Sequence, residues 1–180
     1  MGKEKLRLLL IVGVLVLVLG GAYLFVTLVD TEPPVMVRTG ATALARDFTA
    51  EDEAGNMVQL SELIDQPTLV YFWTTWCDFC TRGMDELALL YEEVGDEMQI
   101  LAVNLSTFGN RRGEAELGRA FMEEMDFSFS SLYDTQGEAS RAYGVTAIPM
   151  MLLLGADGTL YHSQLGFMEL DAMRELIAEF

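Results

Sequence analysis

Cysteine and histidine are scarce in this chain of 180 residues, which has two cysteines, Cys77 and Cys80, and one histidine, His162. A structural zinc site takes about four Cys or His ligands, so a zinc-binding fold is disfavoured. A purely structural disulfide is also disfavoured, because residues three apart close a ring too small to remove much entropy from the unfolded chain. A redox pair and a pair of inert buried thiols are the explanations left.

Basic residues are few as well. Eleven Lys and Arg stand against 28 Asp and Glu, which gives a formal net charge of -17. Proteins that bind nucleic acid need cations to neutralise its phosphates, so nucleic acid is disfavoured as a partner. We interpret the excess of acidic residues as a solvated surface that favours solubility.

A long apolar run occupies the N-terminus. Residues 6–28 contain no charge after Arg7 and are long enough to cross a bilayer as a helix. Lysines precede the run and acidic residues follow it, so the positive-inside rule predicts a cytoplasmic N-terminus at residues 1–5 and a transmembrane anchor at residues 6–28. Residues 29–44, with two adjacent prolines, are predicted to be a tether, and residues 45–180 a globular domain outside the cytoplasm.

A cleaved signal peptide is the alternative for this run. The apolar region of such peptides is usually about 7 to 15 residues long, and the small-residue triplets at residues 41–45 come late for a cleavage site. We therefore favour an uncleaved anchor. No cysteine follows the run directly, which excludes a lipid-modified cysteine. A redox pair outside the cytoplasm, where thiols oxidise, needs an electron donor.

Cys77 and Cys80 lie between a predicted strand and a predicted helix. Residues 68–73 are β-branched and aromatic, as expected of a buried strand, and apolar residues recur with helical spacing over residues 84–91. The positive end of that helix lowers the pKa of the Cys77 thiol toward neutrality. Cys80, one turn later, can close a ring with Cys77 and expel a bound partner. The arrangement favours thiol–disulfide exchange.

Strands and helices alternate along the rest of the domain. Leu117, Ala120, Phe121 and Met125 are predicted to form the buried face of one helix. The order of elements predicts an α/β fold, with helices on both faces of a mixed central sheet. The other strands expected are a hairpin over residues 47–60 and strands at 99–105, 129–132, 150–154 and 159–165. The other helical segments expected are at residues 61–64, a short turn that ends at residue 144, and residues 170–177.

From about residue 46 to 180 the sequence resembles the thioredoxin superfamily, specifically the membrane-anchored TlpA-like and ResA-like extracytoplasmic thiol-disulfide oxidoreductases. The marks are Tyr-Phe-Trp-Thr-Thr-Trp-Cys-Asp-Phe-Cys at 71–80, Tyr-Gly-Val-Thr-Ala-Ile-Pro at 143–149, Asp-Phe at 47–48 and Gly-Ala-Asp-Gly-Thr at 155–159. The resemblance implies a thioredoxin-like three-layer fold. It also implies that Cys77 is the attacking nucleophile and Cys80 the resolving thiol, with Trp76, Ile148 and a cis-Pro149 binding substrate beside them.

Several positions depart from the family pattern, among them Asp85, where family helices often have a second proline. Phe79 stands where the family often has proline, Tyr71 where thioredoxins have a buried Asp, and Gly83 where ResA-like proteins have Glu. The resemblance therefore assigns no catalytic acid or base to a residue of this chain. The proton for Cys80 comes from another group, from water or from the Tyr71 hydroxyl.

The leading hypothesis is an extracytoplasmic protein-disulfide reductase, with no cofactor beyond the Cys77–Cys80 pair and no metal. Its substrates are oxidised protein thiols, for example in cytochrome c maturation, and a CcdA/DsbD-like membrane thiol carrier supplies the electrons. Asp78 opposes a thiolate at Cys77 and so favours a reducing dithiol. The alternatives are a disulfide-forming oxidase of the same fold and a Cu(I)-binding metallochaperone, which the eleven methionines encourage only superficially because most, including Met84, Met125 and Met173, fall on predicted core positions.

Overall fold

The structure is a computed structural model that describes residues 2, 12–13, 15–20 and 43–180. The chain divides into two units, residues 1–35 and 36–180, and the described residues 12–13 and 15–20 are helical. Most of the anchor predicted at residues 6–28, and all of the tether except its last two residues, lie outside the described residues. Within the described part of the chain, no helix is both long enough and apolar enough to cross a membrane.

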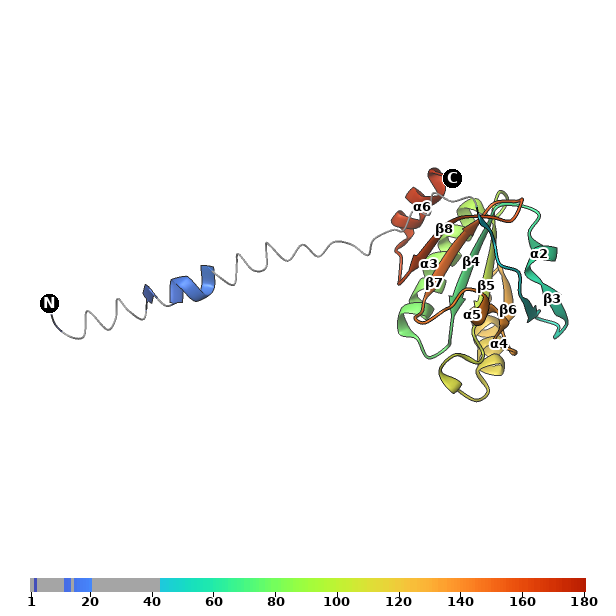
Figure 1. The fold of residues 1–180 in the computed structure, drawn as a ribbon, viewed down its shortest axis with the longest axis horizontal. Helices are drawn as coiled ribbons and strands as arrows, with labels where there is room; N and C mark the ends of the chain where they lie inside the picture. The colour runs from blue at the N-terminus through green and yellow to red at the C-terminus, as the bar shows by residue number, and fades with distance from the viewer. Residues whose placement is uncertain (1, 3–11, 14, 21–42) are drawn as a thin grey trace. The chain divides into compact units, whose positions relative to one another are not determined.

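An eight-stranded mixed sheet forms the centre of the second unit (Figure 1). The strand order is β1-β8-β7-β4-β5-β6-β2-β3. Central strand β4 pairs in parallel with β5 and antiparallel with β7. β1 consists of the last two residues of the predicted tether and pairs with β8. The strands are β1 (Ala43–Leu44), β2 (Thr49–Glu51), β3 (Met57–Gln59), β4 (Thr68–Trp73), β5 (Gln99–Asn104), β6 (Ser130–Tyr133), β7 (Met150–Leu154) and β8 (Thr159–Leu165).

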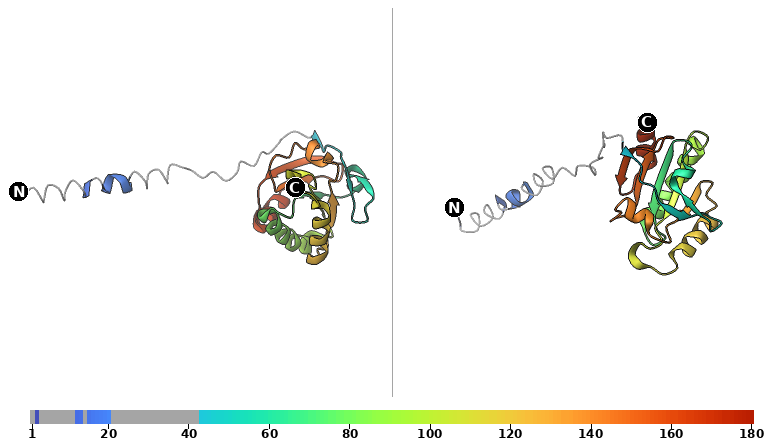
Figure 2. Two further views of the ribbon diagram at one scale, coloured as in Figure 1. Left: turned by 90° about the horizontal axis from the view of Figure 1, so that it is seen from below. Right: turned by 45° about the vertical axis from the view of Figure 1, so that its right-hand side comes forward.

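Helices cover both faces of the sheet (Figures 1 and 2). One core cluster is built with side chains of α3 (Asp78–Val94), α4 (Glu114–Met125) and α6 (Leu170–Ala178). The opposite cluster includes side chains of α2 (Leu60–Leu63) and α5 (Glu138–Ala142). The short 3-10 turn η1 (Phe108–Asn110) precedes α4. The three layers confirm the predicted thioredoxin-like α/β fold of the domain.

Strand β4 connects the two cores. All six of its residues are buried. Leu69, Tyr71 and Trp73 belong to the cluster under α3, whereas Val70 and Phe72 belong to the cluster on the other face. Successive side chains of a strand point to opposite faces, so a strand with helices on both sides reads as an unbroken apolar run. This explains why β4 was recognisable from sequence.

The buried face of α4 differs from the prediction. Leu117 is 47% exposed and Met125 41% exposed, whereas Glu114 and Gly118 are buried. A Cβ at Gly118 would lie 2.8 Å from the Asn104 side-chain nitrogen, so the missing side chain lets α4 approach the sheet closely. Of the predicted face, Phe121 does pack against the core cluster, with its ring centroid 5.3 Å from that of Trp73. The helix is otherwise oriented by a polar contact and a glycine, so the apolar spacing predicted its buried face only in part.

Helix α3 also packs on β4 through a glycine. A Cβ at Gly83 would collide with the hydroxyl oxygen of Tyr71 and lie 3.0 Å from its Cζ atom. We expect Gly83→Ala to destabilise the domain by about 1–3 kcal/mol through overpacking, although Ala normally stabilises a helix interior relative to Gly by about 1 kcal/mol. The measurement is urea unfolding of the wild type and the variant.

The matched control adds Tyr71→Phe, which removes the colliding oxygen. We expect the double variant to lose less free energy of unfolding than the two single variants lose together, because the phenyl ring leaves more room for the new methyl group. Strict additivity in this cycle would contradict the contact between Tyr71 and Gly83.

Candidate active site

Cys77 is the N-cap residue of α3 and follows β4 after a short loop. Its sulfur is bonded to the sulfur of Cys80, and the two Cα atoms are 5.1 Å apart. Cys77 Sγ also accepts a hydrogen bond from the backbone N–H of Cys80 at 3.1 Å. The free N–H groups and positive end of a helix favour negative charge at this place. The position therefore stabilises a thiolate at Cys77 once the disulfide is reduced.

The two sulfur-bearing residues differ in exposure. Cys77 is partly exposed at the surface, whereas Cys80 is 0% exposed and belongs to the core cluster under α3. Exchange requires a thiolate and a disulfide sulfur to meet in line, so access decides which sulfur reacts with another protein. Only the sulfur of Cys77 is within reach of a protein partner.

The Ile148–Pro149 bond lies at the same end of the sheet as the disulfide. Met150 opens β7 and pairs with Phe72 near the end of β4, so the antiparallel register brings Ile148–Pro149 to that end. This peptide bond is cis, as the resemblance implies. Ile148 and Cys77 both pack at the margin of the same core cluster. The fold thus brings together the cysteines and the proline segment, which are about 70 residues apart in the sequence.

Trp76 and Phe79, which directly precede Cys77 and Cys80 in the sequence, each pack against another aromatic side chain. Trp76 is 38% exposed, and its ring lies parallel to that of Phe108, with centroids 6.3 Å apart. Phe79, 59% exposed, packs against Phe167 with centroids 6.4 Å apart. The guanidinium of Arg82 lies over both of these rings, 4.9 Å from the Phe167 centroid and 5.8 Å from that of Phe79. A partner therefore meets an apolar surface that carries one cation.

The Tyr71 hydroxyl donates a hydrogen bond to the backbone carbonyl of Cys80 at 3.1 Å. Burial raises the pKa of Tyr71. A phenol whose pKa is raised keeps its proton at neutral pH, so it does not act as a base. Tyr71 fills the space that Gly83 leaves empty, and together they form a packed, neutral contact.

Sequence reasoning missed Glu114 at the start of α4. Its carboxylate lies 2.6 Å from the backbone N–H nitrogen of Thr75 and 3.1 Å from the side-chain nitrogen of Asn104. The residue is 1% exposed. A glutamate outside an apolar stripe gives no signal of burial, and the glycine one turn later, Gly118, was the one available hint of close packing.

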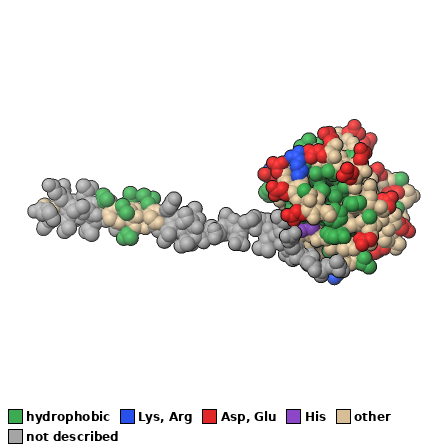
Figure 3. All heavy atoms as spheres, turned by 90° about the horizontal axis from the view of Figure 1, so that it is seen from above, with side chains coloured by type: hydrophobic (Ala, Val, Ile, Leu, Met, Phe, Trp, Pro, Cys, Tyr) green, Lys and Arg blue, Asp and Glu red, His purple; other side chains and the backbone are tan. Residues whose placement is uncertain are grey.

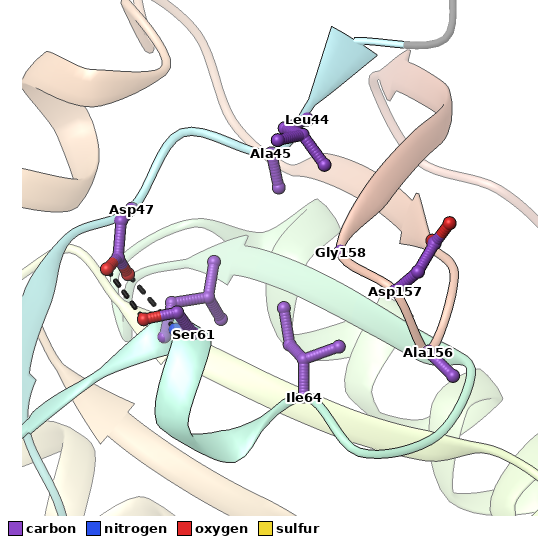
Figure 4. Close-up of a pocket in the computed structure, with 9 residues that line it drawn as sticks. Leu44, Ala45, Asp47, Ser61, Ile64, Ala156, Asp157 and Gly158 are labelled. Carbon is purple, nitrogen blue, oxygen red and sulfur yellow. Dashed lines mark hydrogen bonds between the residues drawn. The ribbon is translucent and has the colours of Figure 1, made fainter.

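The pocket drawn in Figure 4, about 290 Å³ in volume, lies at the other end of the sheet. It is formed by the segment before β2, by α2 and by the turn between β7 and β8. That turn lies beside the beginning of β4, because β7 runs antiparallel to β4. Asp47 accepts hydrogen bonds there from the N–H and hydroxyl of Ser61, at 3.0 and 2.7 Å, and so caps α2.

The surface and the methionines bear on the other predictions. Figure 3 shows many more Asp and Glu side chains than Lys and Arg on the visible face of the domain. Met84 and Met173 are fully buried, as predicted, but Met125, the last residue of α4, is exposed. Among the described residues, no group of three or more His, Cys, Asp and Glu side chains could hold a metal ion.

Comparison with known proteins agrees with this geometry. Residues 41–163 match the model of the AhpC/TSA family. The thiol-disulfide oxidoreductase ResA of Geobacillus kaustophilus is 31% identical over 161 residues, which cover 87% of this chain and 86% of that protein. The thioredoxin-like protein YneN of Bacillus subtilis is 28% identical over 131 residues, covering 73% and 75%.

Solved structures show the same fold. The exposed lipoprotein thioredoxin Etrx1 of Streptococcus pneumoniae superimposes with a TM-score of 0.64 at 25% identity, covering 74% of this chain and 99% of that one. The family match spans residues that include Cys77, Cys80 and the Ile148–Pro149 segment. The chain therefore belongs to the AhpC/TSA thioredoxin-like family and is a thiol-disulfide oxidoreductase of the TlpA/ResA type.

Proposed function

We propose that this protein reduces disulfide bonds of other proteins outside the cytoplasm, with Cys77 as the nucleophile and Cys80 as the resolving thiol. The observation that carries the proposal is the unequal exposure of the two residues, since Cys77 is partly exposed and Cys80 is 0% exposed. An oxidised protein can reach only Cys77. Trp76 and the Ile148–Pro149 segment lie beside it and supply the surface on which the substrate binds.

The reaction proceeds in two exchanges. The Cys77 thiolate attacks one sulfur of the substrate disulfide, the other substrate sulfur leaves as a thiolate, and a mixed disulfide forms. Cys80 then attacks the Cys77 sulfur and releases the second substrate thiol. The substrate gains two electrons, and the Cys77–Cys80 disulfide seen in the structure is restored. A donor dithiol reduces it again by the reverse sequence of exchanges, so no further cofactor is needed.

Charge supports the reducing direction. Asp78 is exposed and adjacent to Cys77, and the domain surface is strongly acidic. Negative charge near Cys77 destabilises the thiolate of the reduced form, and a dithiol whose reduced form is less stable is a stronger reductant. The N-terminus of α3 acts in the opposite sense. We therefore expect a potential nearer to that of thioredoxin than to that of the oxidase DsbA.

Location, donor and client complete the proposal. Residues 6–28 anchor the domain on the extracytoplasmic side, and a CcdA/DsbD-like membrane thiol carrier supplies the electrons. The pneumococcal relative is itself described as an exposed lipoprotein, which supports an extracytoplasmic site of action. Apocytochrome c, whose haem-binding cysteines must be reduced, is the client class that the family resemblance suggests.

The reduction potential tests the direction. We expect a value below about -180 mV, that of protein disulfide isomerase, when the full-length chain in detergent is equilibrated with glutathione or dithiothreitol buffers. Asp78→Asn should make the potential less negative by about 20 mV, whereas Asp85→Asn, an exposed change further along α3, should have a smaller effect. A value above -180 mV would favour the oxidase alternative.

Trapping tests the roles of the cysteines. We expect Cys80→Ser to accumulate a mixed disulfide at Cys77 when the reduced variant is mixed with oxidised apocytochrome c or with an unrelated protein disulfide. Cys77→Ser should trap nothing, because its remaining thiol is buried. Non-reducing electrophoresis and mass spectrometry identify the linked residue. Failure of Cys80→Ser to trap either substrate would contradict exchange with proteins, and equal trapping of both would contradict a preference for apocytochrome c.

A further inference from the structure

Glu114 is buried although its side chain carries a carboxylate, and it hydrogen bonds to the segment that leads to Cys77. Its Oε1 accepts hydrogen bonds from the Thr75 backbone N–H at 2.6 Å and from Asn104 Nδ2 at 3.1 Å. Its Oε2 accepts one from Thr75 Oγ1 at 2.9 Å. Burial of a carboxylate is costly unless hydrogen bonds compensate for lost hydration. The three bonds supply that compensation.

Thr75 belongs to the Cys loop, which we define as residues 74–77. Two residues of chain span at most about 7 Å, so a group that fixes Thr75 limits where Cys77 can move. Asn104, on the other side of the carboxylate, ends β5, which pairs with β4. Its Oδ1 accepts a hydrogen bond from Ser106 Oγ at 2.9 Å, so both ends of this amide are occupied. The carboxylate thus links the Cys loop to the sheet.

The segment between β5 and α4 holds a second residue of the Cys loop. Trp76 stacks on Phe108, with an angle of 5° between the ring planes. Gly109 has a φ of 72°, and a Cβ there would lie 3.0 Å from the Trp76 ring. Two consecutive residues of the Cys loop, Thr75 and Trp76, are therefore held from the same side, one by hydrogen bonds and one by apolar contact.

We propose that Glu114 is a positioning residue for thiol–disulfide exchange, which by holding Thr75 keeps the Cys77 sulfur at the N-terminus of α3. The proposal rests on the role proposed above for Cys77. At this position the sulfur accepts the Cys80 N–H and faces the positive end of the helix. We call the hydrogen bonds of Glu114 to Thr75 and Asn104 the hold. Without the hold, the Cys77 sulfur moves away from the positive end of the helix, and a smaller fraction of the Cys77 thiol is ionised at neutral pH.

Two variants separate the hold from the charge of Glu114. In Glu114→Gln the amide oxygen can accept both N–H bonds, and the amide nitrogen can donate to the Thr75 hydroxyl oxygen, so all three contacts are kept. Glu114→Ala keeps none of them. Both variants lack the carboxylate charge, and any difference between them reports the hold alone. Each is combined with Cys80→Ser, which leaves Cys77 as the only thiol of the chain.

The readout is the rate of Cys77 alkylation by iodoacetamide as a function of pH, on the full-length chain below the melting temperature of each variant. We expect Glu114→Ala to react about fivefold more slowly than Glu114→Gln at pH 7, with the rates converging at high pH where every thiol is ionised. Glu116→Ala, an exposed change in the same turn of α4, should match the Cys80→Ser parent. The charged and titratable groups near Cys77, namely Asp78, Arg82 and Tyr71, are the same in all variants.

Superimposable pH profiles for the Gln and Ala variants, with a difference in melting temperature alone, would overturn the proposal. If Glu114→Ala does not fold, Thr75→Val serves as the test instead, because it removes the hydrogen bond from the Thr75 hydroxyl to Glu114 without changing any charge. We expect it to lower the rate at pH 7 about twofold, and an unchanged profile would also overturn the proposal. Alkylation needs no protein substrate, so a failure of the proposed reductase function would show separately, in the trapping experiment.

Discussion

The packing of α3 on β4 is the contact on which the active site depends. Tyr71 projects from the strand into the space that Gly83 leaves on the helix, and its hydroxyl bonds to the carbonyl of Cys80. This contact buries one face of the first turns of α3, so that Cys80 lies in the core while Cys77 stays at the edge. A helix set further from the strand would expose both sulfurs. The chemical difference between two identical side chains therefore follows from how closely one helix approaches one strand.

Much of this arrangement could be predicted from the sequence, because its causes are local. The unbroken apolar run of β4 follows from burial on both faces, and the stripe of α3 follows from helical periodicity. The cysteines lie where strand gives way to helix. The cis bond before Pro149 was predicted from the family resemblance, since proline alone takes this form at low cost, and the structure contains it.

The features that sequence reasoning missed depend on contacts between distant segments. Nothing in the run Gly113-Glu114-Ala115-Glu116 distinguishes the buried glutamate from the exposed one two residues later. The difference arises from Thr75 and Asn104, which lie on other elements. The same contacts turn α4 so that Leu117 faces solvent. A buried polar group that is stabilised by distant partners leaves no periodic pattern in the sequence. Hydropathy alone therefore predicted Phe121 correctly but placed Leu117 and Met125 on the buried face of this helix, where they are exposed.

The acidic surface described above affects how often two copies of the protein meet and exchange electrons. Oxidised and reduced copies of one thiol-disulfide oxidoreductase could in principle exchange electrons with each other, which would accomplish nothing. Two domains with the same large negative charge repel as they approach within about 10 Å at moderate ionic strength. Encounters between copies are thereby slowed relative to encounters with neutral or basic partners. The charge that makes the surface soluble thus also discourages futile self-exchange and directs the electrons toward unlike molecules.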